Sequence, residues 1–154
     1  MVEQPEERLR IPAEDLEYHS EGYWLHNGAR FTGVAFDLLP DGALDEQTYL
    51  DGYLHGPDRS FRPDGTLADE TWHRHGFRHG IRREFGPDGS FIARGFEYGC
   101  TVWEVAVDAD GTASLLASWS PEELRRSPFY GLREQSFHLP PAAPPSAAAD
   151  LSAH

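Results

Sequence analysis

Histidines are the residues in this chain with the clearest potential for chemistry. His73, His75 and His79 fall within seven residues, and His55 lies one repeat unit earlier. Three imidazoles that converge can bind zinc, and an open fourth position would make the site catalytic. This pattern keeps a metal-dependent enzyme open as one hypothesis.

The neighbours of these histidines favour a different interpretation. Arg74, Arg78 and Arg82 lie among them and would repel a metal cation. The turn pattern places His75 in a turn, flanked by His73 and His79. We therefore expect solvated turn histidines, no metal ion and no cofactor.

Other catalytic signatures are missing from the sequence. Asp108-Ala-Asp110-Gly111 has part of a calcium-loop pattern but lacks the later ligands. The chain contains no G-x-S-x-G elbow and no glycine-rich phosphate loop. Asp69 and Glu70 are adjacent, and in a strand they would point to opposite faces. The sequence thus predicts a protein that is not an enzyme.

Composition limits the partners and the compartment. The chain has 154 residues and a net charge of −13, and all 13 of its basic residues are arginine. Nucleic acids and anionic membranes are held by positive charge, so neither is an expected partner, whereas a basic protein is. A single cysteine, Cys100, allows no intramolecular disulfide. With no signal-peptide pattern at the N-terminus, we expect a cytoplasmic protein.

A repeat organises the elements that carry these residues. Glycines recur at Gly33, Gly56 and Gly80, and Trp103 stands where the fourth is due, with steps of 23, 24 and 23 residues. An Asp-Gly follows each glycine by eight residues, at Asp41, Asp64 and Asp88, and an aromatic residue follows each turn glycine by seven, at Tyr49, Trp72 and Phe96. Self-similarity at such a period indicates an array of supersecondary units.

The repeat predicts an all-β fold. Turn signals arrive too often for crossover helices, so we expect an antiparallel β-hairpin meander of about eight or nine strands. Ser120-Pro121-Glu122-Glu123 forms a capping-box pattern that predicts a short C-terminal helix of about two turns. The predicted organisation is an acidic arm (1–20), a repeat domain (21–119), a helix and capping segment (120–138) and a disordered Pro/Ala tail (139–154).

Register follows if residues equidistant from each Pro-Asp-Gly face each other. This places Leu38 opposite Leu44, Phe61 opposite Leu67, Phe85 opposite Phe91, and Arg59 opposite Asp69. Each large ring would then lie over strand glycines and shield their backbone: Tyr49 over Gly33 and Gly56, and Trp72 over Gly56 and Gly80. Phe96 would meet Gly80 and Trp103, and the regular array should end or bend at Trp103.

The repeated unit G-x₇-D-G-x₆-aromatic-x₂₋₃-G-x₃-G resembles the bacterial MORN-variant repeat over residues 21–111. The acidic leader and the opening Tyr23-Trp-Leu-His-Asn-Gly28 are similar to proteins of the YwqK-type antitoxin family. The resemblance implies a β-hairpin array that binds proteins as an immunity factor against a toxin, and it carries no catalytic residues.

These observations predict a non-catalytic protein-binding module that neutralises a cognate toxin, such as a basic nuclease. Its expected partner-binding residues are Tyr49, Trp72 and Phe96 on one face, with Arg59, Arg62, Arg78, Arg82 and the acidic ends of the chain supplying charge complementarity. A structural or scaffolding repeat protein is the main alternative. We expect the chain to be a monomer or a weak oligomer paired through edge strands.

Overall fold

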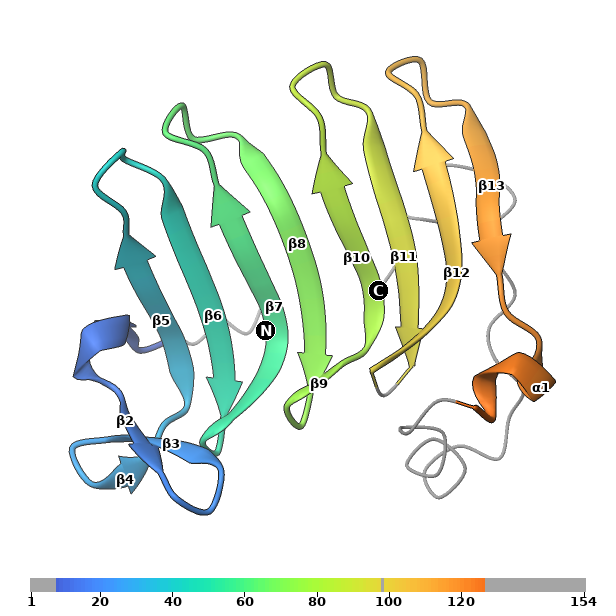
Figure 1. The fold of residues 1–154 in the computed structure, drawn as a ribbon. Helices are drawn as coiled ribbons and strands as arrows, with labels where there is room; N and C mark the ends of the chain where they lie inside the picture. Colours follow the sequence, from blue (N-terminus) through green and yellow to red (C-terminus); the bar gives the residue numbers. More distant parts are fainter. Residues whose placement is uncertain (1–7, 98, 127–154) are drawn as a thin grey trace, which may run out of the picture.

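The fold is a broad β-sheet, described by a computed structural model for residues 8–97 and 99–126 (Figure 1). Within these ranges one sheet has ten strands in the order β1-β5-β6-β7-β8-β10-β11-β12-β13, with β9 paired to β8, and a second has three, β2-β3-β4. The strands of the large sheet are β1 (Arg10–Pro12), β5 (Gly33–Leu38), β6 (Leu44–Leu50), β7 (Tyr53–Phe61), β8 (Leu67–Arg74), β9 (Phe77–Arg78), β10 (Gly80–Phe85), β11 (Phe91–Glu97), β12 (Cys100–Val107) and β13 (Ala113–Ser118).

Smaller elements lie at the two ends of the sheet. A single 3-10 turn, η1 (Ala13–Asp15), leads into the small sheet formed by β2 (Glu17–His19), β3 (Tyr23–His26) and β4 (Ala29–Arg30), beside one end, and α1 (Pro121–Leu124) lies beside β13 at the other (Figure 1). The prediction of an all-β antiparallel meander with a short C-terminal helix is confirmed. One pairing differs, because β1 runs parallel to β5. The described part has more than eight or nine strands because short ones form before Gly33 and at the His75 turn.

Aspartates shape one row of hairpin turns. Asp41, Asp64, Asp88 and Asp110 each accept a hydrogen bond through Oδ1 from the backbone N–H two residues on, at 2.9–3.0 Å. This local bond mimics a backbone turn and is the reason for Asp at that position. The Ser90 and Thr66 hydroxyls add bonds to the same carboxylates and lower the pKa values of Asp88 and Asp64. The predicted Asp-Gly turns are confirmed.

The opposite row of turns is joined from hairpin to hairpin by backbone hydrogen bonds. Asn27, Asp51 and His75 have positive φ of 51°, 50° and 47°, each before a glycine, as tight two-residue hairpin turns require. The glycine N–H of each later turn donates to a carbonyl of the preceding unit: Gly52 to Phe31, Gly76 to Leu54 and Gly99 to Arg78, all at 2.8 Å. We call this row of three bonds the turn seam.

The repeated glycines are not explained by aromatic rings packed over their backbone, as the sequence had led us to predict. Gly56 and Gly80 adopt φ of 103° and 81°, a conformation that side chains disfavour. At Gly33 an added Cβ would lie 2.3 Å from the carbonyl oxygen of Leu9. Gly33 does pair with Tyr49 and Gly80 with Phe96, as predicted, and an added Cβ at Gly80 would lie 3.7 Å from Trp72 Cβ. In neither case is the nearest atom part of a predicted ring. Backbone conformation and close approach therefore explain these glycines.

Bulges shift the predicted register in several places. Trp72 pairs with Pro57 and Tyr49 with Leu54, so neither ring lies opposite Gly56. The pairs Leu38–Leu44, Phe61–Leu67 and Phe85–Phe91 agree with the prediction. Propagating one register from each Pro-Asp-Gly was wrong because strand irregularities absorb a residue in mid-strand.

The array is irregular at Trp103 but does not end there. A bulge beside Gly95 and Phe96 pairs Trp103 with Gly95 and Phe96 with Thr101, so the predicted Phe96–Trp103 meeting is wrong. The indole covers Gly95 so closely that an added Cβ would lie 2.3 Å from Trp103 Cε2. This is the close ring-on-glycine contact that the sequence led us to expect elsewhere. Beyond it, β12 still pairs with β13.

Two hydrophobic cores lie at the ends of the sheet. One contains Ile11, Phe31, Ala35 and Tyr49, and the other contains Ala93, Cys100, Val102, Trp103, Val105, Val107 and Leu124. Between them, no residue of β7 or β10 is fully buried. The centre of the sheet thus presents partly exposed side chains.

The capping box fixes α1 at the far core. Ser120 N–H donates to Glu123 Oε2 at 2.7 Å, and Glu123 N–H donates to Ser120 Oγ at 3.3 Å, as the sequence predicts. The helix has one turn instead of two, and it buries Leu124. The predicted tail (139–154) and most of the capping segment lie outside the described residues.

Candidate functional site

The central strands separate neighbouring residues onto two faces. On β8, Asp69 and Thr71 share one face, while Glu70 and Trp72 share the other, because successive residues of a strand alternate. We call these the Asp69 face and the Glu70 face. The expectation that Asp69 and Glu70 point to opposite sides is confirmed by their separate partners.

Glu70 is the centre of its face. Its side chain is 3% exposed and accepts hydrogen bonds from Arg59 Nε at 2.6 Å, from Arg83 and from Trp72 Nε1 at 3.3 Å. Burial alone would raise the pKa of Glu70, but the bonds from Arg59 and Arg83 outweigh it and lower the pKa to about 2. The carboxylate therefore stays charged and holds both arginines in place.

This arrangement corrects the predicted partner of Arg59. Arg59 pairs with Glu70 and not with Asp69, because the β7–β8 register shifts between Ser60 and Phe61. An irregularity close to the Asp64 turn thus moves Arg59 one residue along the facing strand. The ion pair itself is present, but on a different carboxylate.

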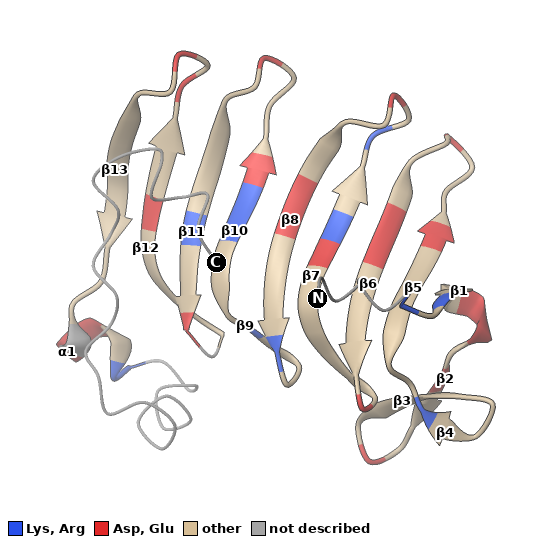
Figure 2. Cartoon of the chain, turned by 180° about the vertical axis from the view of Figure 1, so that it is seen from behind, with Lys and Arg blue, Asp and Glu red and all other residues tan. Residues whose placement is uncertain are grey.

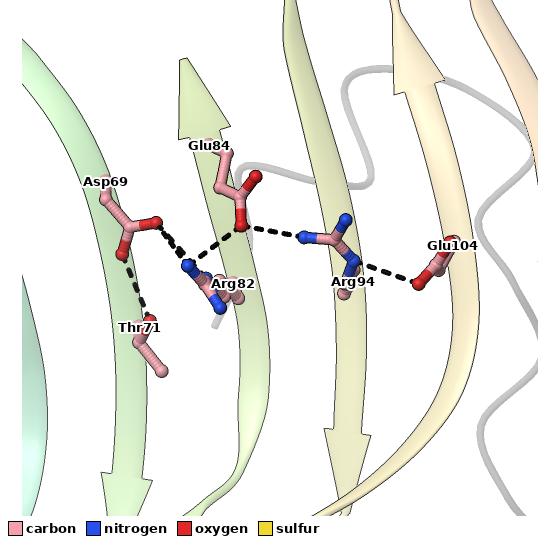
Figure 3. A network of polar contacts seen from close by, with 6 residues as sticks. All are labelled: Asp69, Thr71, Arg82, Glu84, Arg94 and Glu104. Atoms are coloured by element: carbon pink, nitrogen blue, oxygen red, sulfur yellow. Dashed lines mark hydrogen bonds and ion pairs between the residues drawn. The ribbon is translucent and has the colours of Figure 1, made fainter.

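The Asp69 face carries a longer ionic chain, drawn in Figure 3. Arg82 contacts Asp69 and Glu84 at 2.9 and 2.8 Å, and Arg94 contacts Glu84 and Glu104 at 2.8 and 2.9 Å. Thr71 donates to Asp69 at 3.3 Å. Figure 2 shows the wider pattern: acidic segments lie on β6, β8 and β12, basic segments lie on β7, β10 and β11, and β7 and β10 also carry acidic residues.

An open cavity of about 600 Å³ lies beside Trp72. His55, His73 and His79 contribute to its lining, while His75 lies on the turn itself and donates its N–H to His55 Nδ1 at 3.4 Å. The fold thus places His73, His79 and His55 in the cavity lining, while His75 lies outside the lining with its ring 5.2 Å from that of His55. Within the described ranges, no group of three or more His, Cys, Asp or Glu side chains is placed to hold a metal ion.

The histidines near the cavity are held in their neutral form. Burial lowers the pKa of each of His55, His73 and His79. Positive charge adds to the effect, since Arg74 lowers the pKa values of His55 and His79, and Arg78 lowers that of His73. Imidazoles with pKa values below their ordinary 6.5 carry little charge at neutral pH.

The three predicted rings do not share one face. Tyr49 donates to Gln47, whose amide donates to Asp58, and Phe96 is two residues beyond Arg94, so alternation places both rings on the side of the Asp69 face. Trp72 lies on the Glu70 face, and placing the three together was wrong. Tyr49 and Phe96 are only 4% and 7% exposed, whereas Trp72 remains partly exposed.

The predicted arginines also divide. Arg62 donates to the Leu67 carbonyl at 3.1 Å and to the Phe85 carbonyl, so it fastens two hairpins together. Arg82 belongs to the ionic chain. Arg78 is exposed and lies 5.7 Å from the Phe96 ring, and Arg59 lines the cavity.

Sequence reasoning missed Glu70 and Arg83 as the centre of this region. A signal was present, since oppositely charged residues lie on strands that the meander makes adjacent, such as Arg59 on β7 and Glu70 on β8. Using it would have required the bulge positions, which the repeat pattern does not mark.

We compared the chain with protein-family models and with curated protein sequences. No protein-family model matches the chain, and no curated protein matches it in sequence. None of the helices in the described ranges has the length and hydrophobicity needed to cross a bilayer.

Proposed function

We propose that this chain is a non-catalytic protein-binding module, and that it acts in the cytoplasm as an antitoxin or immunity protein of the MORN-variant, YwqK type. The observation that carries the proposal is the open centre of the sheet. Every residue of β7 and β10 is partly exposed, and Trp72 is partly exposed on β8 between them, although Glu70 and Thr71 of β8 are buried. A broad, preformed surface that combines an aromatic ring with arginines is typical of protein interfaces.

Charge indicates the kind of partner. A protein of net charge −13 attracts a basic one, and complementary charge accelerates association more than it adds affinity. A basic toxin, such as a nuclease, meets this requirement. Binding over its active surface would neutralise it without any catalytic step on this chain.

We propose as contacts those predicted partner-binding residues whose side chains remain at least partly exposed. Trp72 and Arg59 offer surface on the Glu70 face, and Arg78 offers surface beside the turn. Tyr49 and Phe96 act mainly as scaffold because they are buried. Arg62 and Arg82 are fixed by intramolecular bonds, and the acidic ends of the chain supply the negative charge that attracts a basic partner.

Co-expression with the product of the neighbouring gene tests the proposal. We expect the neighbour alone to arrest growth, and this chain to restore growth and to co-purify with it. Trp72→Ala should lower recovery of the partner, whereas Tyr18→Ala, which removes a ring that is 63% exposed at the end of the sheet, should not. Equal recovery with both variants would remove the Glu70 face from the interface, and a harmless neighbour would count against the antitoxin role.

A self-assembling scaffold is the second candidate, and β13 favours it. β13 has no charged residue, and Leu115 and Leu116 are 57% and 54% exposed. Edge strands without charge or proline readily pair with other strands. The opposite edge, β1, is only three residues long and contains Pro12.

Light scattering over a range of protein concentrations separates the two candidates. Assembly through β13 predicts a mass that rises with concentration and falls to that of the monomer in Leu115→Lys. A constant monomer mass for the unchanged protein would argue against the scaffold.

A further inference from the structure

The cavity beside Trp72 is a basic island in an acidic protein. Arg8, Arg59 and Arg74 line it, no aspartate or glutamate is among the described residues of the lining, and the nearest carboxylate to Arg59 is the buried Glu70 behind it. The chain as a whole has twice as many acidic as basic residues, 26 against 13. A cluster of guanidinium groups in a concave site attracts anions.

Arg59 is placed to hold a ligand. In the described part of the chain, its hydrogen bond and its ion pair both use Nε, which contacts Glu70 Oε2 at 2.6 Å. Neither terminal nitrogen takes part in those contacts, the side chain is 37% exposed, and Arg59 belongs to the cavity lining. The ion pair with Glu70 holds the Arg59 guanidinium in place. Because Glu70 is only 3% exposed, its carboxylate does not contact a ligand in the cavity.

A flat apolar wall adjoins the arginines. Pro57 and Trp72 pair across β7 and β8, and both line the cavity. The bond from Trp72 Nε1 to Glu70 Oε1 at 3.3 Å orients the indole. A ring or other planar group lying on this wall would place an attached anionic group beside the arginines.

The imidazoles complete the lining without adding charge. His55 and His79 have lowered pKa values, first through burial and then through His75 for His55 and Arg74 for both. Neutral imidazoles can donate or accept hydrogen bonds, which suits the polar edge of a ligand. The positive charge of the cavity thus comes from its arginines.

We propose that this cavity binds an oxyanion, either a carboxylate or a phosphate, carried on a planar apolar group. The oxyanion contacts the arginines Arg59 and Arg74, since a guanidinium group matches either anion with two parallel hydrogen bonds. The planar group lies against Trp72. This inference does not depend on the proposed antitoxin role.

Titration with two small probes tests it. Benzoate carries the carboxylate and phenyl phosphate carries the phosphate, while benzyl alcohol is the neutral control. The readout is the Trp72 indole N–H resonance in ¹H–¹⁵N NMR, assigned by its loss in Trp72→Phe. We expect a saturable shift with at least one anionic probe and none with benzyl alcohol. A response to benzoate alone, to phenyl phosphate alone or to both identifies the oxyanion, and a response to neither overturns the proposal.

Two matched variants distinguish binding in the cavity from a general effect of losing one positive charge. Arg74→Gln and Arg78→Gln each remove one positive charge from the β8–β9 hairpin, but only Arg74 lines the cavity. Arg74→Gln should weaken probe binding about ten-fold, the usual loss for one charge-assisted hydrogen bond, and Arg78→Gln should leave it nearly unchanged. Equal weakening in both variants, with unchanged melting temperatures, would also overturn the proposal.

Discussion

The two faces of β8 hold charge in different ways. On one face, the Glu70 carboxylate is 3% exposed and pairs with both Arg59 and Arg83. On the other, a chain runs from Asp69 to Glu104 through side chains that are 25–38% exposed. Asp69 and Glu70 are adjacent in sequence, so burial and not composition separates them. Ion pairs in water contribute little, whereas a buried charge depends strongly on its partners.

The largest expected effect comes from neutralising the buried carboxylate. Glu70→Gln leaves Arg59 and Arg83 facing an uncharged group in a partly buried site. We expect the free energy of unfolding to fall by about 3 kcal/mol, measured by urea denaturation. A loss below about 1 kcal/mol would mean that the two faces are energetically alike.

The pH dependence of stability should follow the same carboxylate. The pKa of Glu70 is about 2 in the folded protein, against an ordinary value of 4.5. Because the folded pKa is the lower one, its contribution is fully present above about pH 4.5 and is lost as the pH falls toward about 2. Urea unfolding across this range should show the gap between the unchanged protein and Glu70→Gln closing. A constant gap would contradict the assignment.

A smaller effect is expected on the Asp69 face. Glu84→Gln removes the carboxylate that joins Arg82 to Arg94, but both arginines keep a second acidic partner. We expect a loss of no more than about 1 kcal/mol in the free energy of unfolding. A loss equal to that of Glu70→Gln would show that the chain acts as one cooperative unit.

The smallest expected effect is the salt dependence of these two losses of stability, which should differ between Glu70→Gln and Glu84→Gln. At about 1 M salt the screening length is about 3 Å, which weakens exposed pairs far more than buried ones. The cost of Glu84→Gln should then almost disappear, while that of Glu70→Gln persists. Paired denaturation curves at low and high salt measure both, and an equal decline would place Glu70 in a more solvated environment than its burial indicates.

Local chemistry made most of the fold predictable. Asp-Gly turns, the capping box at Ser120 and the 23–24-residue period depend on neighbours in sequence, and the structure confirms the turns and the cap. The predicted pairs nearest the Pro-Asp-Gly turns, such as Phe85 with Phe91, also agree. These features needed no knowledge of distant contacts.

The candidate site was less predictable because register errors accumulate along a strand. One irregularity between Ser60 and Phe61 is enough to move Arg59 to Glu70 and Trp72 to Pro57. Alternation then decides which face a ring occupies, so a shift of one residue changes the surface assigned to it. The approach of Arg8 to the cavity comes from the chain segment before β1, whose path no repeat pattern encodes.

The turn seam described above has a consequence for how such a chain can change in length. Each seam bond joins positions one repeat apart, as Gly76 of one turn joins Leu54 beside the turn before it. Removing or duplicating a whole repeat leaves every remaining seam bond with an equivalent partner. Repeat arrays built from nearest-neighbour contacts are therefore free to vary in copy number. The breadth of the sheet, and with it the reach of its surface, can change in steps of one hairpin without redesign of any turn.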